Sequence, residues 1–188
     1  MRKLKLQVQT TINGFVGGPN GELNWMEWNW TDDIKNYVNE LHNNIDTILM
    51  GRKMTDGFIS AWSDIVKDPD NNQYPFAKKM LDIPKVVFTK TMKKSQWPNT
   101  TLATGDINKE VDNLKNQDGK DMIVYGGAGF VSSLIQNNLI DEYYLFVNPS
   151  VIDDGLKIFD KIDSLSFMDL IESREFECGI VLNKYKRK

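Results

Sequence analysis

Cysteine and histidine are nearly absent from this 188-residue chain, which contains one of each, Cys178 and His42. A single cysteine excludes an internal disulfide and a cysteine-based zinc site, and it fits a reducing compartment. A single histidine leaves little scope for a histidine metal cluster or for a Ser-His-Asp triad. We therefore expect no resident metal ion and no hydrolase chemistry of the triad type.

Long apolar runs are also missing. No segment approaches the run of about 18 apolar residues that a membrane helix needs, and the N-terminus lacks the apolar core of a signal peptide. The formal net charge of −3 gives no sign of the clustered basic residues on which nucleic-acid binding depends, and the basic tail KYKRK is typical of a solvated chain end. These absences predict a cytoplasmic protein that binds neither membranes nor nucleic acid.

The alternation of strand and helix patterns predicts an α/β fold in one domain, residues 1–188. Repeated strand–helix units favour a mostly parallel central sheet with helices on both faces, and two long final strands would add an antiparallel hairpin at one edge. The expected strands cover residues 4–9, 46–50, 84–89, 102–103, 122–125, 141–148, 167–175 and 176–184, and the expected helices begin near residues 32, 52, 75, 107 and 130.

Three details of this assignment can be tested. In the first strand Leu4, Leu6 and Val8 alternate with polar residues, which predicts a strand buried on one face only. The helix that begins at residue 52 is expected to end at Gly57. In the last strand Cys178 shares the apolar alternation, so we treat it as a core residue and not as a nucleophile.

The stretch DMIVYGGAGF, residues 121–130, organises the expected functional site. An apolar strand runs into Gly126 and Gly127, and a helical pattern follows Gly129. Glycines allow a positive φ and expose backbone N–H groups, so such a turn admits phosphate oxygens at the positive end of a helix. The dinucleotide fingerprint is only partly matched, because Ser132 stands at the third glycine position, and a tight turn without a ligand is the alternative.

Two other strand ends carry cations or hydroxyls. Gly51 is followed by Arg52 and Lys53 at the start of a helix, where cations oppose the helix dipole and so favour an external anion. Thr89 and Lys90 follow the strand at 84–89. Solvated surface cations would explain both pairs as well. Since ligands of parallel sheets gather at the carboxyl ends of the strands, we expect all three turns on one rim.

Aromatic and acidic residues come together before the first helix. Trp25 and Trp28 lie in the segment NWMEWNW, which would line a flat ring-binding pocket, with core packing or a lid over the core as the alternatives. Asp33 stands next to Asp32 in the first turn of the helix, where carboxylates are favoured by the helix dipole.

Five segments in this order resemble the dihydrofolate reductase-like superfamily, in particular the branch that contains the reductase domain of riboflavin biosynthesis (RibD C-terminal domain). They are TTINGFVGG (10–18), ILMGRKMTDGF (48–58), VVFTKT (86–91), IVYGGAGFVSSLIQNNLIDEYYLFVNP (123–149) and DDGLKIF (153–159). The resemblance covers nearly the whole chain. It implies the three-layer α/β/α fold of that superfamily, NADPH as the cofactor and a homodimer.

The resemblance also implies roles for individual residues. The NADPH ligands would be Gly51, Arg52 and Lys53 for the adenosine-side phosphates, Thr89 and Lys90 near the 2′-phosphate, Gly126, Gly127, Ala128, Gly129 and Phe130 at the pyrophosphate, and Thr10, Val16 and Gly17 beside the nicotinamide. Independently of the resemblance, the aromatic segment would place Trp25 and Trp28 over a planar substrate. Asp33 stands nearest to the catalytic carboxylate of the folate reductases.

Two departures from the family pattern bear on function. Met54 replaces the expected threonine after the Gly-Arg-Lys unit, with Thr55 one place later, and the segment before Asp33 differs from that of the folate reductases.

From the resemblance we expect an NADPH-dependent reductase of an aminouracil, pyrimidine or pterin-like ring, similar to 5-amino-6-(5-phosphoribosylamino)uracil reductase. The alternative is a nucleotide-binding or regulatory protein that keeps the fold without catalysis.

Overall fold

The computed structural model describes residues 1–163 and 165–188. Eight strands form one sheet: β1 (Leu4–Thr10), β2 (Ile45–Gly51), β3 (Lys85–Phe88), β4 (Thr100–Ala103), β5 (Asp121–Val124), β6 (Glu142–Val147), β7 (Met168–Glu175) and β8 (Val181–Arg187). Five helices accompany them: α1 (Asp32–Asn43), α2 (Arg52–Ile65), α3 (Tyr74–Asp82), α4 (Ile107–Lys115) and α5 (Ala128–Gln136). The order of elements is the one that the sequence predicts.

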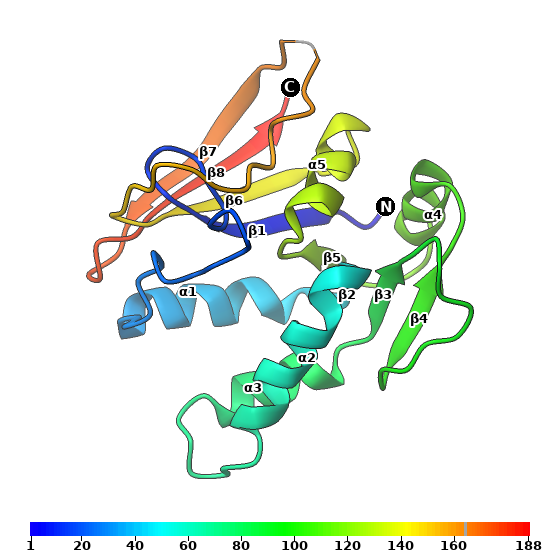
Figure 1. Cartoon of the computed structure of the whole chain (residues 1–188), viewed down its shortest axis with the longest axis horizontal. Helices are drawn as coiled ribbons and strands as arrows, with labels where there is room; N and C mark the ends of the chain where they lie inside the picture. Colours follow the sequence, from blue (N-terminus) through cyan, green and yellow to red (C-terminus); the bar gives the residue numbers. More distant parts are fainter. Residues whose placement is uncertain (164) are drawn as a thin grey trace.

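The strand order in the sheet is β4-β3-β2-β5-β1-β6-β8-β7 (Figure 1). The first six strands of that order run parallel, β8 pairs antiparallel with β6, and β7 pairs antiparallel with β8. The predicted parallel sheet with a C-terminal antiparallel hairpin is therefore confirmed. Because β1 to β6 are parallel, their carboxyl ends share one edge of the sheet, which we call the carboxyl edge.

Helices cover both faces of the sheet and create two apolar cores. On one face, α1 and α3 bury side chains such as Ile34, Val38 and Met80 against the sheet. On the other face, α4 and α5 bury Val111 and Leu134. In Figure 1, α1, α2 and α3 lie together on one side of the strands and α4 and α5 on the other. The predicted three-layer α/β/α arrangement is confirmed.

The prediction that β1 is buried on one face only is wrong. Lys5 and Gln7 are each 8% exposed, so they are buried like their apolar neighbours. The strand lies between β5 and β6 in the middle of the sheet, and helical layers cover both of its faces. The ammonium group of Lys5 forms an ion pair with Asp121, 2.9 Å away. This pairing allows a charged residue in a strand that has no solvent-facing side, and it explains why the alternation of polar and apolar residues does not mark an exposed face.

The expected end of α2 at Gly57 is also wrong, because the helix continues to Ile65. Met54, Phe58 and Trp62, spaced four residues apart, pack against the core beneath α1 and α3. Three apolar contacts along one helical stripe outweigh the cost of about 1 kcal/mol that a glycine imposes on a helix interior.

The final hairpin differs from the prediction at its turn. Residues 176–180 connect β7 and β8 and are not part of a strand: Gly179 has a φ of +83°, and the N–H of Phe176 donates to the carbonyl of Ile180 at 2.9 Å. Cys178 lies in this turn, half-buried against the core, and not in the buried face of a strand as predicted. None of the described helices is both long and apolar enough to cross a membrane.

Candidate active site at the carboxyl edge

The carboxyl edge brings the three predicted turns together. Gly51 ends β2, Thr89 follows β3 and Gly126 comes two residues after β5. These strands are neighbours in the order β3-β2-β5, and β1, which ends at Thr10, lies next to β5. Three turns, of which the first and the last are more than seventy residues apart in the chain, therefore lie along one rim.

The turn after β5 has the geometry of an anion site. Gly127 takes a φ of +78°, in the left-handed region that favours glycine, and forms the N-cap of α5. Its carbonyl accepts the N–H groups of Phe130 at 2.8 Å and Val131 at 3.0 Å. The N–H groups of Ala128 and Gly129 belong to the first turn, which has no partners within the helix, so they are available to a ligand at its positive end.

The neighbouring turns are packed tightly against this one. A Cβ on Gly51 would lie 2.9 Å from the Cβ of Phe130, so only glycine allows β2 to end here. The Phe130 ring packs 4.9 Å from the ring of Phe88 at the end of β3. Phe130 thus joins the ends of β2 and β3 to the start of α5 and fixes the position of the backbone there.

Arg52 and Lys53 stand exposed in the first turn of α2, which contains no acidic residue. Neither belongs to an ion pair within residues 1–163 and 165–188. The helix dipole disfavours two cations at this end, and no carboxylate of the described residues lies within ion-pairing distance of either. Lys90 is a third exposed cation on the same rim. This arrangement is suited to a polyanion.

The hydroxyl groups near the rim are engaged by the protein. Thr89 is buried, and its Oγ1 accepts the N–H groups of Thr91 and Met92, both at 3.2 Å, which shapes the turn that presents Lys90. Thr55, which follows the substituted Met54, is fully buried and donates to the carbonyl of Gly51 at 3.2 Å. Thr55 therefore does not replace the missing hydroxyl. Met54 instead lies over the glycine turn, with its Sδ 3.5 Å from the Cβ position of Gly126.

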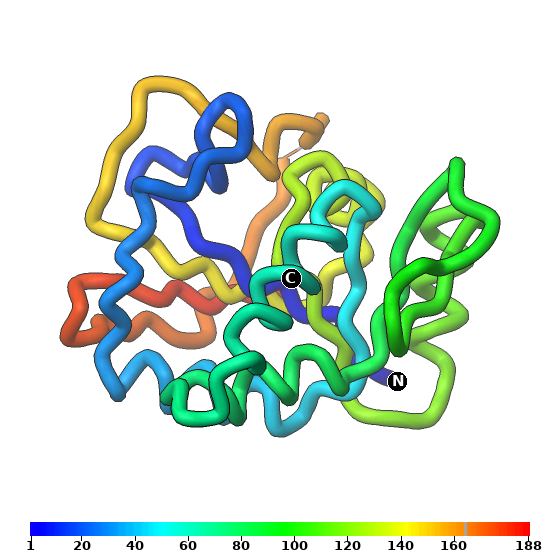
Figure 2. The backbone as a smooth tube through the Cα atoms, turned by 60° about the horizontal axis from the view of Figure 1, so that its bottom comes forward, coloured from blue at the N-terminus to red at the C-terminus, as the bar shows by residue number. Residues whose placement is uncertain are grey.

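The loop after β1 is pinned to the segment after β6, and the two run side by side in Figure 2. The N–H of Val16 donates to the carbonyl of Leu156, and the N–H of Leu156 donates to the carbonyl of Gly17, both at 2.8 Å. A Cβ on Gly155 would come within 2.2 Å of that Gly17 oxygen, which explains the glycine in DDGLKIF. The backbone near Thr10, Val16 and Gly17 is thus held rigidly at the carboxyl edge.

Asp33 is bound by protein groups. Its carboxylate accepts hydrogen bonds from the Thr31 hydroxyl at 2.5 Å, the N–H of Ile34 at 2.8 Å and the N–H of Glu177 at 3.0 Å. The bond from Thr31, with support from the two backbone N–H groups, holds the pKa of Asp33 below its usual value. An ionised carboxylate that ties α1 to the β7–β8 turn fits the helix-start interpretation better than a proton donor.

The two tryptophans that the sequence singles out lie in different environments. Trp25 is buried, and its Nε1 donates to the carbonyl of Glu22 at 3.0 Å. Trp28 is 62% exposed, with its Nε1 3.3 Å from the carbonyl of Leu23. Trp25 therefore anchors the loop, whereas Trp28 offers a free aromatic face to a ligand.

Sequence reasoning missed Asn148, the residue that holds the tryptophan segment in place. Asn148 is fully buried at the end of β6; its Nδ2 donates to Gln9 Oε1 at 2.8 Å, and its Oδ1 accepts the N–H of Glu27 at 2.9 Å. Its own N–H donates to the carbonyl of Thr10 at 2.7 Å. An asparagine between a strand and Pro149 was the available signal, but only the folded chain brings its partners within reach.

A buried pair behind the glycine turn also escaped the sequence reasoning. His42 is fully buried, its Nδ1 lies 2.6 Å from the carbonyl of Val38, and its Nε2 is hydrogen-bonded to the hydroxyl of Tyr125. Burial lowers the pKa of His42 to about 4, so the ring is neutral at physiological pH. Tyr125 directly precedes Gly126, so this bond fixes the base of the turn.

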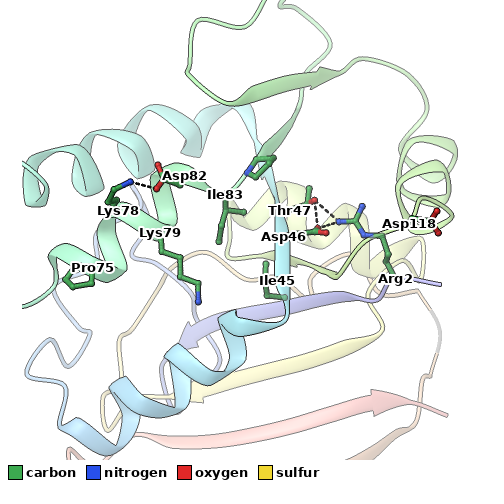
Figure 3. Close-up of a pocket in the computed structure, with 11 residues that line it drawn as sticks. Arg2, Ile45, Asp46, Thr47, Pro75, Lys78, Lys79, Asp82, Ile83 and Asp118 are labelled. Atoms are coloured by element: carbon green, nitrogen blue, oxygen red, sulfur yellow. Dashed lines mark hydrogen bonds and ion pairs between the residues drawn. The ribbon is translucent and has the colours of Figure 1, made fainter.

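A separate depression of about 780 Å³ lies at the opposite end of the strands, near the start of β2 and β3 (Figure 3). Two of its cations are paired with carboxylates: Arg2 pairs with Asp46 and donates to Thr47 Oγ1 at 2.6 Å, and Lys78 pairs with Asp82 at 2.6 Å. Because ligands of parallel sheets bind at the carboxyl ends of the strands, we place the candidate site at the carboxyl edge.

Comparisons with known proteins agree with this fold. The sequence profile of the RibD C-terminal domain family matches residues 2–182. YyaP of Bacillus subtilis (strain 168), an uncharacterized protein, is 30% identical over 184 residues, which cover 96% of this chain and 92% of YyaP. The solved structure of a Shewanella sp. PV-4 protein named after riboflavin biosynthesis has a TM-score of 0.75 and 22% identity, covering 100% of this chain and 99% of that one.

A second solved structure is the diaminohydroxyphosphoribosylaminopyrimidine deaminase/5-amino-6-(5-phosphoribosylamino)uracil reductase of Thermotoga maritima. It has a TM-score of 0.69 and 18% identity, and the likeness covers 100% of this chain but 57% of the Thermotoga chain. Both structural likenesses lie below 25% identity and show a shared fold. The profile match and the identity to YyaP go further and confirm the resemblance: this chain belongs to the RibD C-terminal domain family.

Proposed function

We propose that this protein is an NADPH-dependent reductase that transfers a hydride to a small heterocyclic substrate of the aminouracil, pyrimidine or pterin type. Membership of the RibD C-terminal domain family supports the reaction class. The observation that carries the proposal is the rim: Gly127 forms a left-handed N-cap, and Arg52 and Lys53 on the same rim form no ion pair with any residue that the structure describes. A dinucleotide with several phosphates satisfies both features.

In this proposal the chain supplies position and charge. The backbone of Gly126 to Gly129 binds the pyrophosphate, Arg52 and Lys53 bind the adenosine-side phosphates, and Lys90, presented by the Thr89 turn, binds the 2′-phosphate. Thr10, Val16 and Gly17 line the nicotinamide subsite. NADPH, when bound, supplies the hydride. The proposed assignment thus gives a role to Arg52, Lys53 and Lys90 and to the glycine turn after β5.

The substrate lies next to the nicotinamide subsite under the tryptophan segment, with Trp28 as its aromatic cover. Because Asp33 is held ionised by three hydrogen bonds, we propose that the proton reaches the substrate from water and that Asp33 is structural. The same observation favours the second candidate function, a nucleotide-binding or regulatory protein that keeps the fold without catalysis.

We also propose a homodimer. The edge strand β7 and the segment before it expose large apolar side chains: Phe167 is 65% exposed, Leu170 57% and Ile171 47%. An edge strand with exposed apolar residues is prone to pair with another chain unless it is covered. A second copy of this chain would cover it.

A cofactor titration tests the proposed function. The quenching of tryptophan fluorescence is followed while NADPH or NADH is added, and the oxidation of NADPH is then measured with aminouracils, pyrimidines and pterins. We expect micromolar binding with a preference for NADPH and turnover of at least one of these rings. Tight binding without turnover of any ring would favour the regulatory alternative, and failure to bind either nucleotide would contradict both functions.

A further inference from the structure

Three buried side-chain polar atoms have no hydrogen-bond partner in the part of the chain that the structure describes: Gln7 Oε1, Trp30 Nε1 and Ser150 Oγ. All three lie within a few residues of the Asn148 network. Gln7 is two residues from Gln9 on β1, Trp30 is three residues from Glu27, and Ser150 is two residues from Asn148 itself. Unpartnered buried polar atoms are rare in folded proteins, so three of them, each within three residues of a member of one hydrogen-bond network, point to a polar partner from outside the chain.

Gln7 points to the face of the sheet that carries α1. Its neighbours Leu6 and Val8 belong to the core beneath α4 and α5, and side chains alternate between the two faces of a strand. Gln7 therefore shares the opposite face with Tyr144, its registered partner on β6. It is 8% exposed, so water contributes little to the solvation of its carboxamide.

Trp30 reaches the same face. Its ring packs against the core beneath α1, two residues before that helix begins at Asp32. The indole N–H groups of Trp25, Trp28 and Trp97 all donate to protein oxygens, at 3.0, 3.3 and 2.7 Å, whereas that of Trp30 is buried without an acceptor. The hydrogen bond from Glu27 to Asn148 holds this segment over the ends of β1 and β6.

The two groups have complementary chemistry. A carboxamide offers one acceptor and a donor side by side, and an indole offers a donor only; neither carries a charge. Together they match the edge of a lactam, in which a C=O and an N–H are adjacent and a further carbonyl accepts from the indole. A protonated or amidine-type ring edge would instead need a carboxylate, and Asp33 is already occupied by three donors.

We propose that Gln7 and Trp30 are specificity-determining residues that recognise the neutral lactam edge of the substrate ring. This inference rests on the proposed function, since it names the residues that select the heterocycle in that same site. The two residues would bind uracil-type rings, in which C=O and N–H groups alternate around the ring edge, and would reject rings in which N-alkylation has removed the N–H donors.

The test observes the indole N–H resonances of the ¹⁵N-labelled full-length protein, in which Trp30→Phe identifies the signal of Trp30. The protein is titrated with 6-aminouracil and, as the matched ligand, with 6-amino-1,3-dimethyluracil, which lacks both lactam N–H groups. We expect 6-aminouracil to move the Trp30 signal, the dimethyl compound to leave it in place, and the Trp25 signal to stay constant. A Trp30 signal that does not respond to 6-aminouracil overturns the proposal.

Variants on β1 separate ligand recognition from folding. Gln7→Met removes an amide without a protein partner, so we expect an unchanged or higher midpoint of thermal unfolding and at least a tenfold loss of affinity for 6-aminouracil. Gln9→Met is the matched control, because Gln9 is bonded to Asn148 and its loss should lower the midpoint. A lower midpoint for Gln7→Met with unchanged 6-aminouracil affinity would show that Gln7 is structural.

The NADPH affinity of Gln7→Met distinguishes this inference from the proposed function. We expect it to equal that of the parent. If the parent binds NADPH but 6-aminouracil does not move the Trp30 signal, this inference fails and the proposed function stands. If 6-aminouracil moves that signal while NADPH does not bind, the recognition pair stands and the proposed function fails.

Discussion

Exposed cations at a helix start are costly unless something pairs with them, and Arg52 is such a residue. It stands in the first turn of α2 with no acidic neighbour in that turn. His42 presents the opposite case, a titratable side chain that burial keeps neutral. Both residues bear on the proposed phosphate rim. Arg52 contributes a positive charge to it, and His42 is hydrogen-bonded to Tyr125, which precedes the glycine turn. Each makes a measurable prediction.

Replacement of Arg52 by alanine should weaken NADPH binding. A charge-assisted hydrogen bond to phosphate contributes about 1.5 kcal/mol or more, so the Kd for NADPH should rise roughly tenfold. Isothermal titration calorimetry measures the change. Lys67→Ala is the matched control, since Lys67 lies just beyond the other end of α2 and pairs with Asp64. Equal NADPH affinity of Arg52→Ala and the parent would remove Arg52 from the phosphate site.

Acidification should destabilise the protein through His42 between pH 6.5 and about 4. Burial lowers the pKa of His42 from 6.5 to about 4, so below pH 6.5 the unfolded chain binds a proton that the folded chain does not. Stability is therefore lost as the pH falls through this window, by up to about 3 kcal/mol at about 1.36 kcal/mol per pKa unit. Urea unfolding at several pH values measures it. In His42→Phe the slope over this window should be flatter, and an unchanged slope would assign the pH dependence to other groups.

Glycines act differently in the interior of an element and at its end. Gly57 lies within α2, where a Cβ would meet no atom within 4 Å, whereas a Cβ on Gly51 would meet Phe130 at 2.9 Å. The first glycine weakens a helix that tertiary contacts of Phe58 and Trp62 maintain. The second allows β2, β3 and α5 to meet at the rim. The residue type alone does not distinguish a glycine within a helix, such as Gly57, from a glycine that a close contact requires, such as Gly51.

Gly57→Ala should therefore stabilise the protein by about 0.5 to 1 kcal/mol, because alanine favours the helix and lowers the entropy of the unfolded chain. Gly51→Ala should destabilise it by about 1 to 3 kcal/mol, because the rim has no room for the methyl group. Chemical denaturation measures both free energies of unfolding. Destabilisation by Gly57→Ala would mean that α2 requires flexibility at this position.

The sheet as a whole has two unlike edges. β4, at one edge, is short, whereas β7, at the other, has eight residues and exposes two large apolar side chains, Leu170 and Ile171. A long edge strand of this kind is a site of association, which is the basis for the proposed homodimer. The proposed cofactor rim lies on the carboxyl edge of β1, β2, β3 and β5, away from β7 in the strand order.

Light scattering coupled to size-exclusion chromatography should give the mass of a dimer. Leu170→Lys places a charge among the exposed apolar residues of β7 and should shift the protein to the mass of a monomer without unfolding it. Val151→Lys, at a 65% exposed position outside β7, is the control and should remain dimeric. A parent protein with the mass of a monomer at micromolar concentration would contradict the proposal.

Local patterns in the sequence were sufficient to predict the order of the elements, the class of the sheet and the three turns of the rim. The reason is that strand and helix periodicity, glycine turns and capping signals act over a few neighbouring residues. Membership of the family followed from five such segments in order, and the profile over residues 2–182 confirms it.

Tertiary structure alone decided the burial of β1 on both faces, the continuation of α2 past Gly57 and the partners of Asp33 and Asn148. Each depends on contacts between residues far apart in the chain, such as Asp33 with Glu177 and Asn148 with Glu27, which periodicity does not encode. The buried carboxamide oxygen of Gln7, which has no hydrogen-bond partner among the described residues, belongs to the same class. A polar residue in an alternating strand is expected to face water, and only the helices packed over β1 turn Gln7 into a buried residue.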